Sequence, residues 1–282
     1  MLNGFAGAAI CTIILPPRNC ICGAPASCNA PGRQSRRLTE PSIVVIIPAL
    51  DEEGAIGDVV GAIPRELAAL AIVVDNGSRD ATAQRAQEAG ALVVSEPRRG
   101  YGRACAAGVR SLPASCEIVV FLDGNGSDDA SAMERLIAPV RDGRFDLAIG
   151  SRTRGTREPG SMAPHQILAG RIAGLVIAFA YGVRYTDMCP FRAIARRRLD
   201  ALGMREETYG WNVEMQVLAA RDGLKILELP VDHRNRRTGE SKVSGNLRAS
   251  IVAALRILAV LGRAALRHRL QATAARTGSV SL

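Results

Sequence analysis

The amino-acid sequence predicts an α/β fold in which a mostly parallel sheet is covered by helices on both faces. Short runs of β-branched and other apolar residues recur along the chain, as in strands that are buried on both sides. Segments with helical periodicity lie between these runs, and strands that alternate with helices are typical of parallel sheets. Polar residues follow several of the runs, which indicates a ligand site at the carboxyl edge of the sheet.

Five apolar runs are predicted to be strands, and they lie at 43–47, 71–74, 91–94, 118–122 and 146–149. The intervening segments are predicted to be helices, at 55–63, 81–89, 103–112 and 130–140. Residues 187–192 are expected to form a loop between two later helices. The remaining predicted elements are an apolar helix over 167–183, a helix that contains 196–198, a helix that opens at 209–214 and a late strand over 226–231.

Acidic and amide side chains follow three of the predicted strands. The segments 48–53, 75–80 and 123–129 each hold several of them, and Arg152 follows the fifth strand. One such loop alone is explained by turn and helix-cap chemistry, because Asp, Asn, Gly and Ser are favoured there. Three loops at the same sheet edge instead indicate carboxylates around a cleft. The pattern therefore predicts a divalent cation that joins the protein to a phosphorylated ligand.

The charge of the chain lies at its ends. Of the formal net charge of +9, residues 1–40 contribute +3, from four Arg and one Glu, and residues 246–282 contribute +6, from six Arg and no acid. The remainder nets to zero, whereas a nucleic-acid-binding protein usually has a basic patch on its folded body. We therefore expect no nucleic-acid partner and three parts: an N-terminal extension without regular structure over 1–41, a folded domain over 42–245 and a basic segment over 246–282.

Composition excludes several classes of protein. Hydrophobic residues make up 48% and charged residues 22% of the chain, which is ordinary for a globular protein and excludes disorder throughout. No apolar stretch reaches the ~20 residues that a membrane-spanning helix needs. The seven cysteines are odd in number and irregularly spaced, so a disulfide framework is not expected and a reducing, cytoplasmic setting is.

Seven segments resemble the family 2 inverting glycosyltransferases of the GT-A fold, and most of all the dolichyl-phosphate and polyprenyl-phosphate sugar synthases. The resemblance extends over about 42–245. Each segment alone is a weak match, but all seven occur in order and at suitable spacing. They are VVIIPALDEE (44–53), IVVDNGSRDAT (72–82), VVFLDGNGSDD (119–129), AIGSR (148–152), DMCPFRAI (187–194), YGWNVEMQ (209–216) and ELPVDHRNRRTGESK (228–242).

The resemblance implies a binding site for a nucleotide-sugar donor, either a UDP-sugar or a GDP-sugar. The metal, Mg²⁺ or Mn²⁺, would be held by Asp123 and Asn125, where the family has an Asp-x-Asp motif. Asn125 therefore supplies an oxygen ligand but no charge. The donor-binding residues implied by the resemblance are Pro48, Leu50, Glu52, Asp75, Asn76, Asp123, Arg152, Arg236 and Lys242.

The resemblance also implies a single in-line displacement that inverts the sugar carbon. Negative charge then develops on the leaving diphosphate, and the metal together with Arg236 and Lys242 would stabilise it. A polyprenyl phosphate, the acceptor that the resemblance favours, is already an anion and needs no base. A soluble hydroxyl acceptor would need a general base, for which Asp187 is the candidate.

Two other functions stay open at this point. A non-catalytic regulator that binds sugar nucleotides is possible, because Asn125 could mark a degenerate metal site. A dinucleotide-binding dehydrogenase is a weaker alternative, since the Gly100-x-Gly102 turn follows the third strand rather than the first. A transferase would slowly hydrolyse its donor, whereas a regulator would bind it without turnover.

The C-terminal segment has the pattern of a basic amphipathic helix. Such a helix can lie on an anionic membrane surface or pack on the folded domain. With a lipid-phosphate acceptor, the first alternative predicts a cytoplasmic protein that binds peripherally to the inner face of the membrane. One stripe of the helix holds Leu247, Ile251, Leu255, Leu258 and Leu261, and the opposite side holds Arg248, Arg256, Arg263 and Arg267.

Overall fold

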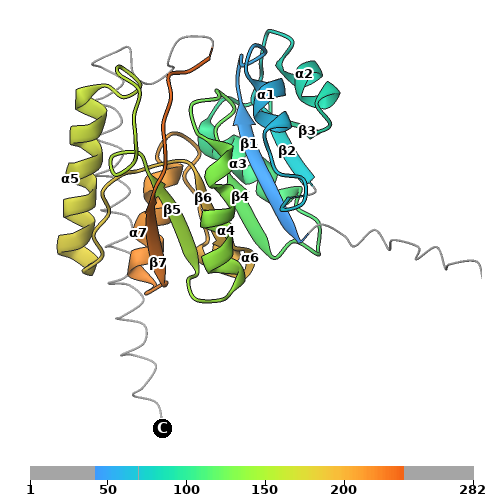
Figure 1. Cartoon of the computed structure of the whole chain (residues 1–282). Coiled ribbons are helices and arrows are strands. Elements are labelled where there is room, and N and C mark those ends of the chain that lie inside the picture. Colours follow the sequence, from blue (N-terminus) through green and yellow to red (C-terminus); the bar gives the residue numbers. More distant parts are fainter. Residues whose placement is uncertain (1–41, 69, 238–282) are drawn as a thin grey trace, which may run out of the picture. The chain divides into compact units, whose positions relative to one another are not determined.

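The computed structural model of the chain describes residues 42–68 and 70–237 (Figure 1). They contain a seven-stranded sheet with the order β3-β2-β1-β4-β6-β5-β7. The predicted α/β fold with a mostly parallel sheet is confirmed. The strands are β1 (Ile43–Ala49), β2 (Leu70–Asp75), β3 (Leu92–Ser95), β4 (Ile118–Phe121), β5 (Leu147–Ser151), β6 (Arg192–Ala195) and β7 (Ile226–Pro230).

The strand β1 lies in the interior of the sheet, where it pairs in parallel with β2 on one side and β4 on the other. Every residue of β1 is buried. This explains why its sequence is a continuous apolar run, since a strand covered on both faces has no polar side. The strand β3 lies at one edge of the sheet and has exposed residues at both its ends. Its sequence therefore does not need to be apolar throughout, as that of β1 does.

The strand β6 differs from the sequence prediction. It begins at Arg192, within the segment predicted to be a loop, and runs antiparallel to both β4 and β5. In this register Arg192 lies opposite Phe121 of β4 and Ile149 of β5. The start of β6 therefore lies beside the carboxyl end of β4. As a result, the segment 187–191 before β6 reaches the edge of the sheet where the acidic loops lie.

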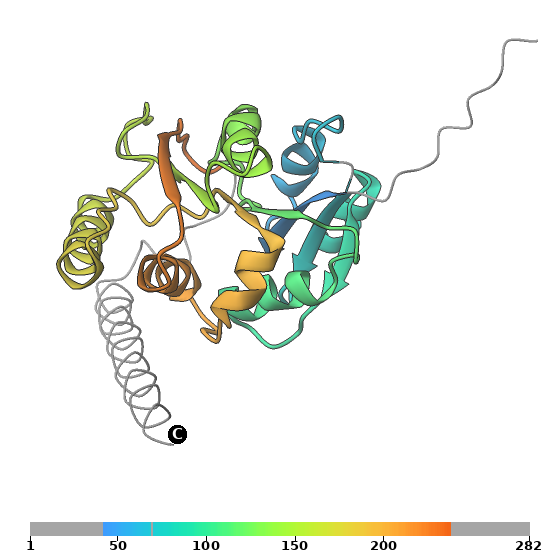
Figure 2. The same cartoon turned by 90° about the horizontal axis from the view of Figure 1, so that it is seen from below.

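Helices cover both faces of the sheet, as predicted. Figure 2 shows α1 and α4 on one face and α3, α6 and α7 on the other. The long helix α5 packs against α7 near the β7 end of the sheet. The helices are α1 (Ile56–Gly61), α2 (Thr82–Glu88), α3 (Tyr101–Arg110), α4 (Met133–Arg141), α5 (Pro164–Tyr181), α6 (Arg196–Leu202) and α7 (Trp211–Arg221), with a 3₁₀ turn at Ala130–Ala132.

Three predicted features lie outside the described residues: the N-terminal extension over 1–41, Lys242, and the basic segment over 246–282. Within 42–68 and 70–237, no helix is both long and apolar enough to cross a membrane.

Candidate active site

A cavity of about 950 Å³ opens where the carboxyl ends of the parallel strands meet. Loops after β1, β2, β4, β5 and β7 contribute to it, together with the start of α3 and the segment that leads into α5. Parallel sheets bind ligands at this edge, because the strands end there and their loops converge. The predicted site residues that line the cavity are Pro48, Leu50, Glu52, Asn76, Asp123, Asn125, Arg152 and Arg236.

The loops after β1 and β2 hold each other in place. The Asp51 N–H donates to Ser78 Oγ at 3.0 Å, and the Arg79 N–H donates to Asp51 Oδ1 at 2.8 Å. Asp51 itself has a φ of 50°, a left-handed conformation that Asp adopts more readily than most residues. The Glu52 N–H donates to Thr82 Oγ1 at 2.8 Å. These bonds fix the backbone that presents Leu50 and Glu52 to the cavity.

Asp75 and Asn76, which the family resemblance assigns to the donor, are both engaged within the protein. Asn76 lines the cavity, but its Nδ2 donates to two backbone oxygens in the segment 96–98, and its Oδ1 accepts the Gly100 N–H at 2.7 Å. Asp75 does not line the cavity, and its Oδ1 accepts the Ser78 N–H at 3.1 Å. Both side chains therefore order the loops in which they lie, and their contacts with the donor stay a prediction.

Asp123 and Asn125 lie in the loop after β4, where the sequence predicts a metal. Tyr101 Oη donates to Asp123 Oδ1 at 3.1 Å. Burial and the nearby Asp128 carboxylate raise the pKa of Asp123 to about 6, because the charged form loses hydration and meets a like charge. Asn125 Oδ1 accepts the Ser127 N–H at 2.9 Å and so shapes the loop. A cation beside Asp123 would offset the repulsion between the two carboxylates.

His233 also lines this cavity, and the sequence analysis did not select it. Its side chain is buried, and Nδ1 lies 3.2 Å from Asp128 Oδ1. The other oxygen of Asp128 is buried and has no hydrogen-bond partner among the described residues. An imidazole held by a carboxylate through one nitrogen commonly presents the other nitrogen to a metal. The sequence analysis did not select His233 because it lies just before several arginines, and such a basic run is typical of a solvent-exposed loop.

Arg152 and Asp187 form a buried ion pair. Arg152 donates from Nε to Asp187 Oδ2 and from Nη2 to Oδ1, both at 2.8 Å. The same carboxylate also accepts the backbone N–H groups of Arg152 and Met188. Burial alone would raise the pKa of Asp187, but the charge of Arg152 and these hydrogen bonds outweigh it and hold the pKa below its ordinary value.

This geometry argues against a general-base role for Asp187. Its carboxylate already accepts four hydrogen bonds, does not line the cavity, and has a lowered pKa. A base needs a free lone pair within reach of the acceptor proton. The structure favours a role in which Asp187 anchors Arg152, whose side chain does line the cavity.

At the opposite side of the cavity, Arg236 pairs with Glu52 Oε1. Arg236 Nε is buried and makes no hydrogen bond within the described part of the chain. The guanidinium therefore retains a donor that an anionic ligand can use.

Arg192 supports the floor of the cavity from below. It is fully buried, and its guanidinium donates to the backbone oxygens of Cys189, Pro190 and Asn212. Burial lowers the pKa of Arg192. Because Pro190 and Asn212 line the cavity, this one side chain joins the segment before β6 to the start of α7.

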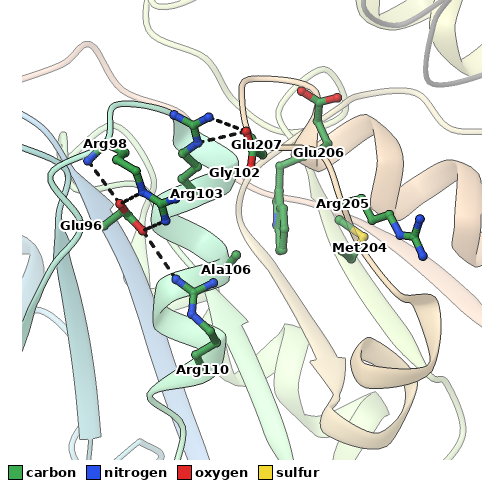
Figure 3. A pocket seen from close by; sticks show the side chains of 11 residues that line it. Glu96, Arg98, Gly102, Arg103, Ala106, Arg110, Met204, Arg205, Glu206 and Glu207 are labelled. Carbon is green, nitrogen blue, oxygen red and sulfur yellow. Dashed lines mark hydrogen bonds and ion pairs between the residues drawn. The ribbon is translucent and has the colours of Figure 1, made fainter.

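A second cavity, of about 350 Å³, lies between α3 and the segment before α7 (Figure 3). Three of the four arginines that line it pair with glutamates: Glu96 contacts Arg98 at 3.0 Å and Arg110 at 3.5 Å, and Arg103 pairs with Glu207. These contacts link two elements that also form a wall of the large cavity. The ion pairs around the smaller cavity therefore stabilise that wall.

Comparison with known proteins agrees with this geometry. The model of glycosyl transferase family 2 matches residues 44–203. An uncharacterized glycosyltransferase of Mycobacterium tuberculosis is 38% identical over 218 residues, which cover 76% of this chain and 95% of that protein. The undecaprenyl-phosphate mannosyltransferase of Micrococcus luteus is 30% identical, over 62% of this chain and 76% of that protein.

A solved structure supports the fold. The crystal structure of glucosyl-3-phosphoglycerate synthase from Mycobacterium tuberculosis, in complex with Mn²⁺ and UDP-glucose, matches with a TM-score of 0.63. The match covers 79% of each chain at 23% identity. Together with the match of the family model over the sheet and its acidic loops, these similarities show that the chain is a glycosyltransferase and belongs to family 2.

Proposed function

We propose that this glycosyltransferase moves a sugar from a nucleotide-diphosphate sugar to a polyprenyl phosphate. The observation that supports this acceptor is the kind of carboxylate in the cavity. Among the described residues that line it, the only carboxylates are Glu52 and Asp123. Glu52 is paired with Arg236, and Asp123 stands at the predicted metal position. The imidazole of His233, which also lines the cavity, is proposed below as a ligand of the cation. With that nitrogen engaged, an acceptor that must lose a proton is left without a base, whereas a phosphate acceptor needs none.

A divalent cation fits the residues at the Asp123 end. Asp123, Asn125 and His233 offer a carboxylate, an amide oxygen and an imidazole around one cavity. No group of three or more His, Cys, Asp or Glu side chains in the described part of the chain could hold a metal alone. Oxygens of the donor diphosphate would complete the ligand set, as is usual for Mg²⁺ and Mn²⁺ in phosphoryl sites. When bound, the cation neutralises charge on the leaving diphosphate.

The side chains of the protein perform the remaining work. Arg152 and Arg236 face the cavity from two sides and can donate charge-assisted hydrogen bonds to the diphosphate as its charge grows. Asp187 keeps Arg152 in one orientation, so little reorganisation is needed during the displacement. Lys242, outside the described residues, is proposed as a further cation at the diphosphate. Inversion follows from attack by the acceptor phosphate opposite the leaving group.

The relatives support this choice of acceptor without deciding it. One named relative is an undecaprenyl-phosphate mannosyltransferase, whereas the solved structure is of a synthase whose named product is glucosyl-3-phosphoglycerate. We propose the lipid phosphate because the relative with that acceptor is 30% identical to this chain, against 23% for the solved structure, and because both carboxylates that line the cavity are engaged, Glu52 with Arg236 and Asp123 with the proposed cation. We further propose that the protein acts at the inner face of the membrane.

The test compares two acceptors that differ only in the phosphate. Purified protein is incubated with UDP-sugars and GDP-sugars and either a polyprenyl phosphate or the matching polyprenol, with Mn²⁺, with Mg²⁺ or with a chelator. We expect lipid-linked sugar only from the phosphate and only with metal. Equal transfer to the polyprenol, or transfer only to a soluble hydroxyl acceptor, would refute the proposed acceptor. Donor binding without hydrolysis or transfer under all conditions would instead indicate a regulator.

A further inference from the structure

The helix α5 presents large apolar side chains to solvent along one face. Leu168, Ile172, Leu175 and Phe179 have exposed fractions of 59%, 52%, 60% and 97%. Their spacing of four, three and four residues places them on a single stripe of the helix. Elsewhere in the described residues, the only other large apolar side chains of comparable exposure are Leu92 and Tyr209. We call the four residues the α5 stripe.

The other face of α5 is buried through small residues. Gly170, Ala173, Gly174 and Ile177 are the buried residues of the helix, and α5 packs against α7. A Cβ atom at Gly174 would lie 2.1 Å from the backbone oxygen of Tyr185, so the backbone there approaches its neighbour too closely for any other residue. The amphipathic pattern is thus inverted, because the small residues face the protein and the large apolar ones face outward. Fold stability does not explain the stripe.

From this stripe we infer that α5 is a docking surface for a lipid bilayer with anionic headgroups. The helix and its flanks are free of acidic residues: within 160–186, the charged side chains are Arg171 and Arg184, both exposed. A membrane-surface helix combines an apolar face with basic residues in this way, because the apolar side chains enter the interface and the cations meet the headgroups. A protein partner would not require the absence of every acidic residue from this surface.

The position of α5 relative to the cavity supports this surface. Residues 160–163 and Gln166, at and just before the start of α5, line the large cavity. The helix continues from that wall for 18 residues, about 27 Å. With α5 on the membrane, the cavity wall would lie at the bilayer surface. A phosphate joined to a membrane-embedded chain could then reach the cavity. This delivery of the acceptor rests on the proposed function, whereas the docking of α5 on a membrane does not.

The experiment is vesicle flotation of the full chain. Vesicles of phosphatidylcholine alone are compared with vesicles that contain phosphatidylglycerol, at low and high salt. The double variant Leu175→Ser/Phe179→Ser should reduce binding to anionic vesicles by roughly tenfold or more, because two apolar side chains lose their burial. The matched control is Leu92→Ser, an exposed apolar residue of β3 at the opposite end of the sheet (Figure 1), and it should bind as the wild type does.

Further variants assign the result. Arg171→Glu should weaken binding to anionic vesicles and leave the weak binding to neutral vesicles unchanged. Leu255→Ser/Leu258→Ser tests the C-terminal segment: if this variant loses vesicle binding and the α5 variant does not, the docking surface lies there and the inference is wrong. Failure of the wild type to bind any vesicle also overturns it, as does a dimer in sedimentation velocity that the α5 variant dissolves.

A separate readout distinguishes this inference from the proposed function. Donor hydrolysis in free solution should be the same in the wild type and the α5 variant, because no stripe residue lines the cavity. Loss of hydrolysis in the variant would mean that the substitutions disturb the fold and that the stripe is structural. Vesicle binding with no transfer to any lipid phosphate would refute the acceptor and leave the docking surface supported.

Discussion

Replacing Asp187 by Asn distinguishes an anchoring carboxylate from a catalytic one. The Asp187 and Arg152 side chains are 3% and 18% exposed, so the change breaks a buried ion pair. The side chain of Asn keeps one oxygen and has an NH2 group in place of the other. Two of the four N–H donors around residue 187 would then face this NH2 group, which is itself a donor. Losing two charge-assisted hydrogen bonds at about 1.5 to 3 kcal/mol each agrees with the ~3 to 5 kcal/mol that is typical when a buried pair is broken.

The assay is urea unfolding followed by the fluorescence of Trp211, the single and buried tryptophan of the chain. The control is Asp200→Asn, because the Arg196–Asp200 pair is largely exposed, at 27% and 50%, and should contribute less than about 1 kcal/mol. A variant at 187 that keeps its stability but loses transfer to a hydroxyl acceptor would refute the anchoring role and restore the general base.

The same pair predicts a dependence of stability on pH. Asp187 has a pKa below its ordinary value of 3.8 in the folded chain, so its contribution to stability is fully present above that value. It is lost as the pH falls from there through the lower pKa of the folded state. The difference in unfolding free energy between the wild type and Asp187→Asn should therefore be constant in neutral solution and shrink in acid. A difference that grows in acid would contradict the assignment.

Four further substitutions test the cavity. Asp123→Asn should lower transfer by about a hundredfold or more in a folded protein, because a metal ligand at the diphosphate loses its charge; near wild-type turnover would exclude the metal site. Asn125→Asp should lower the Mn²⁺ concentration needed for half-maximal activity, and an unchanged Mn²⁺ titration would argue against a ligand at 125. Arg236→Ala should weaken donor binding about tenfold by calorimetry, whereas the exposed control Arg234→Ala should not. Arg192→Lys should slow transfer about tenfold more than donor hydrolysis, since the compact ammonium of lysine cannot reproduce the planar spread of guanidinium donors toward the three carbonyls; equal losses would mean a purely structural role.

Much of this architecture could be predicted from the sequence, because buried parallel strands leave an unmistakable pattern. The run at 43–47 is the fully buried interior strand β1, and the loops that follow β1, β4 and β5 do line one cavity. The short strand β6 could not be predicted, because it begins with Arg192, a charged residue whose burial depends on hydrogen bonds to the backbone oxygens of Cys189, Pro190 and the distant Asn212.

The sequence indicates a site residue when the role of that residue depends on the loop that contains it. It does not do so when the role depends on a side chain that only folding brings near. Asp187 is an acid in a plausible segment, but only the folded chain brings Arg152 to it. His233 gains significance only through Asp128, which lies 105 residues earlier in the chain. Asn76 follows the same rule, since its side chain bonds the backbone at residues 96, 98 and 100, which lie 20 to 24 positions away in the chain.

The reversed direction of β6 has a consequence for how such enzymes can diversify. Loops from the parallel strands reach the cavity after their strands end, whereas the segment 187–191 reaches it before β6 begins. Its first residue, Asp187, is tied to Arg152 of the loop after β5, whereas Met188 and Pro190 line the cavity. Substitutions at these two positions would leave both the Asp187–Arg152 pair and the register of β1, β2 and β4 unchanged. A lineage could thus reshape the cavity at Met188 and Pro190 without disturbing the side chains proposed to hold the diphosphate, and redesign of the cavity should begin there.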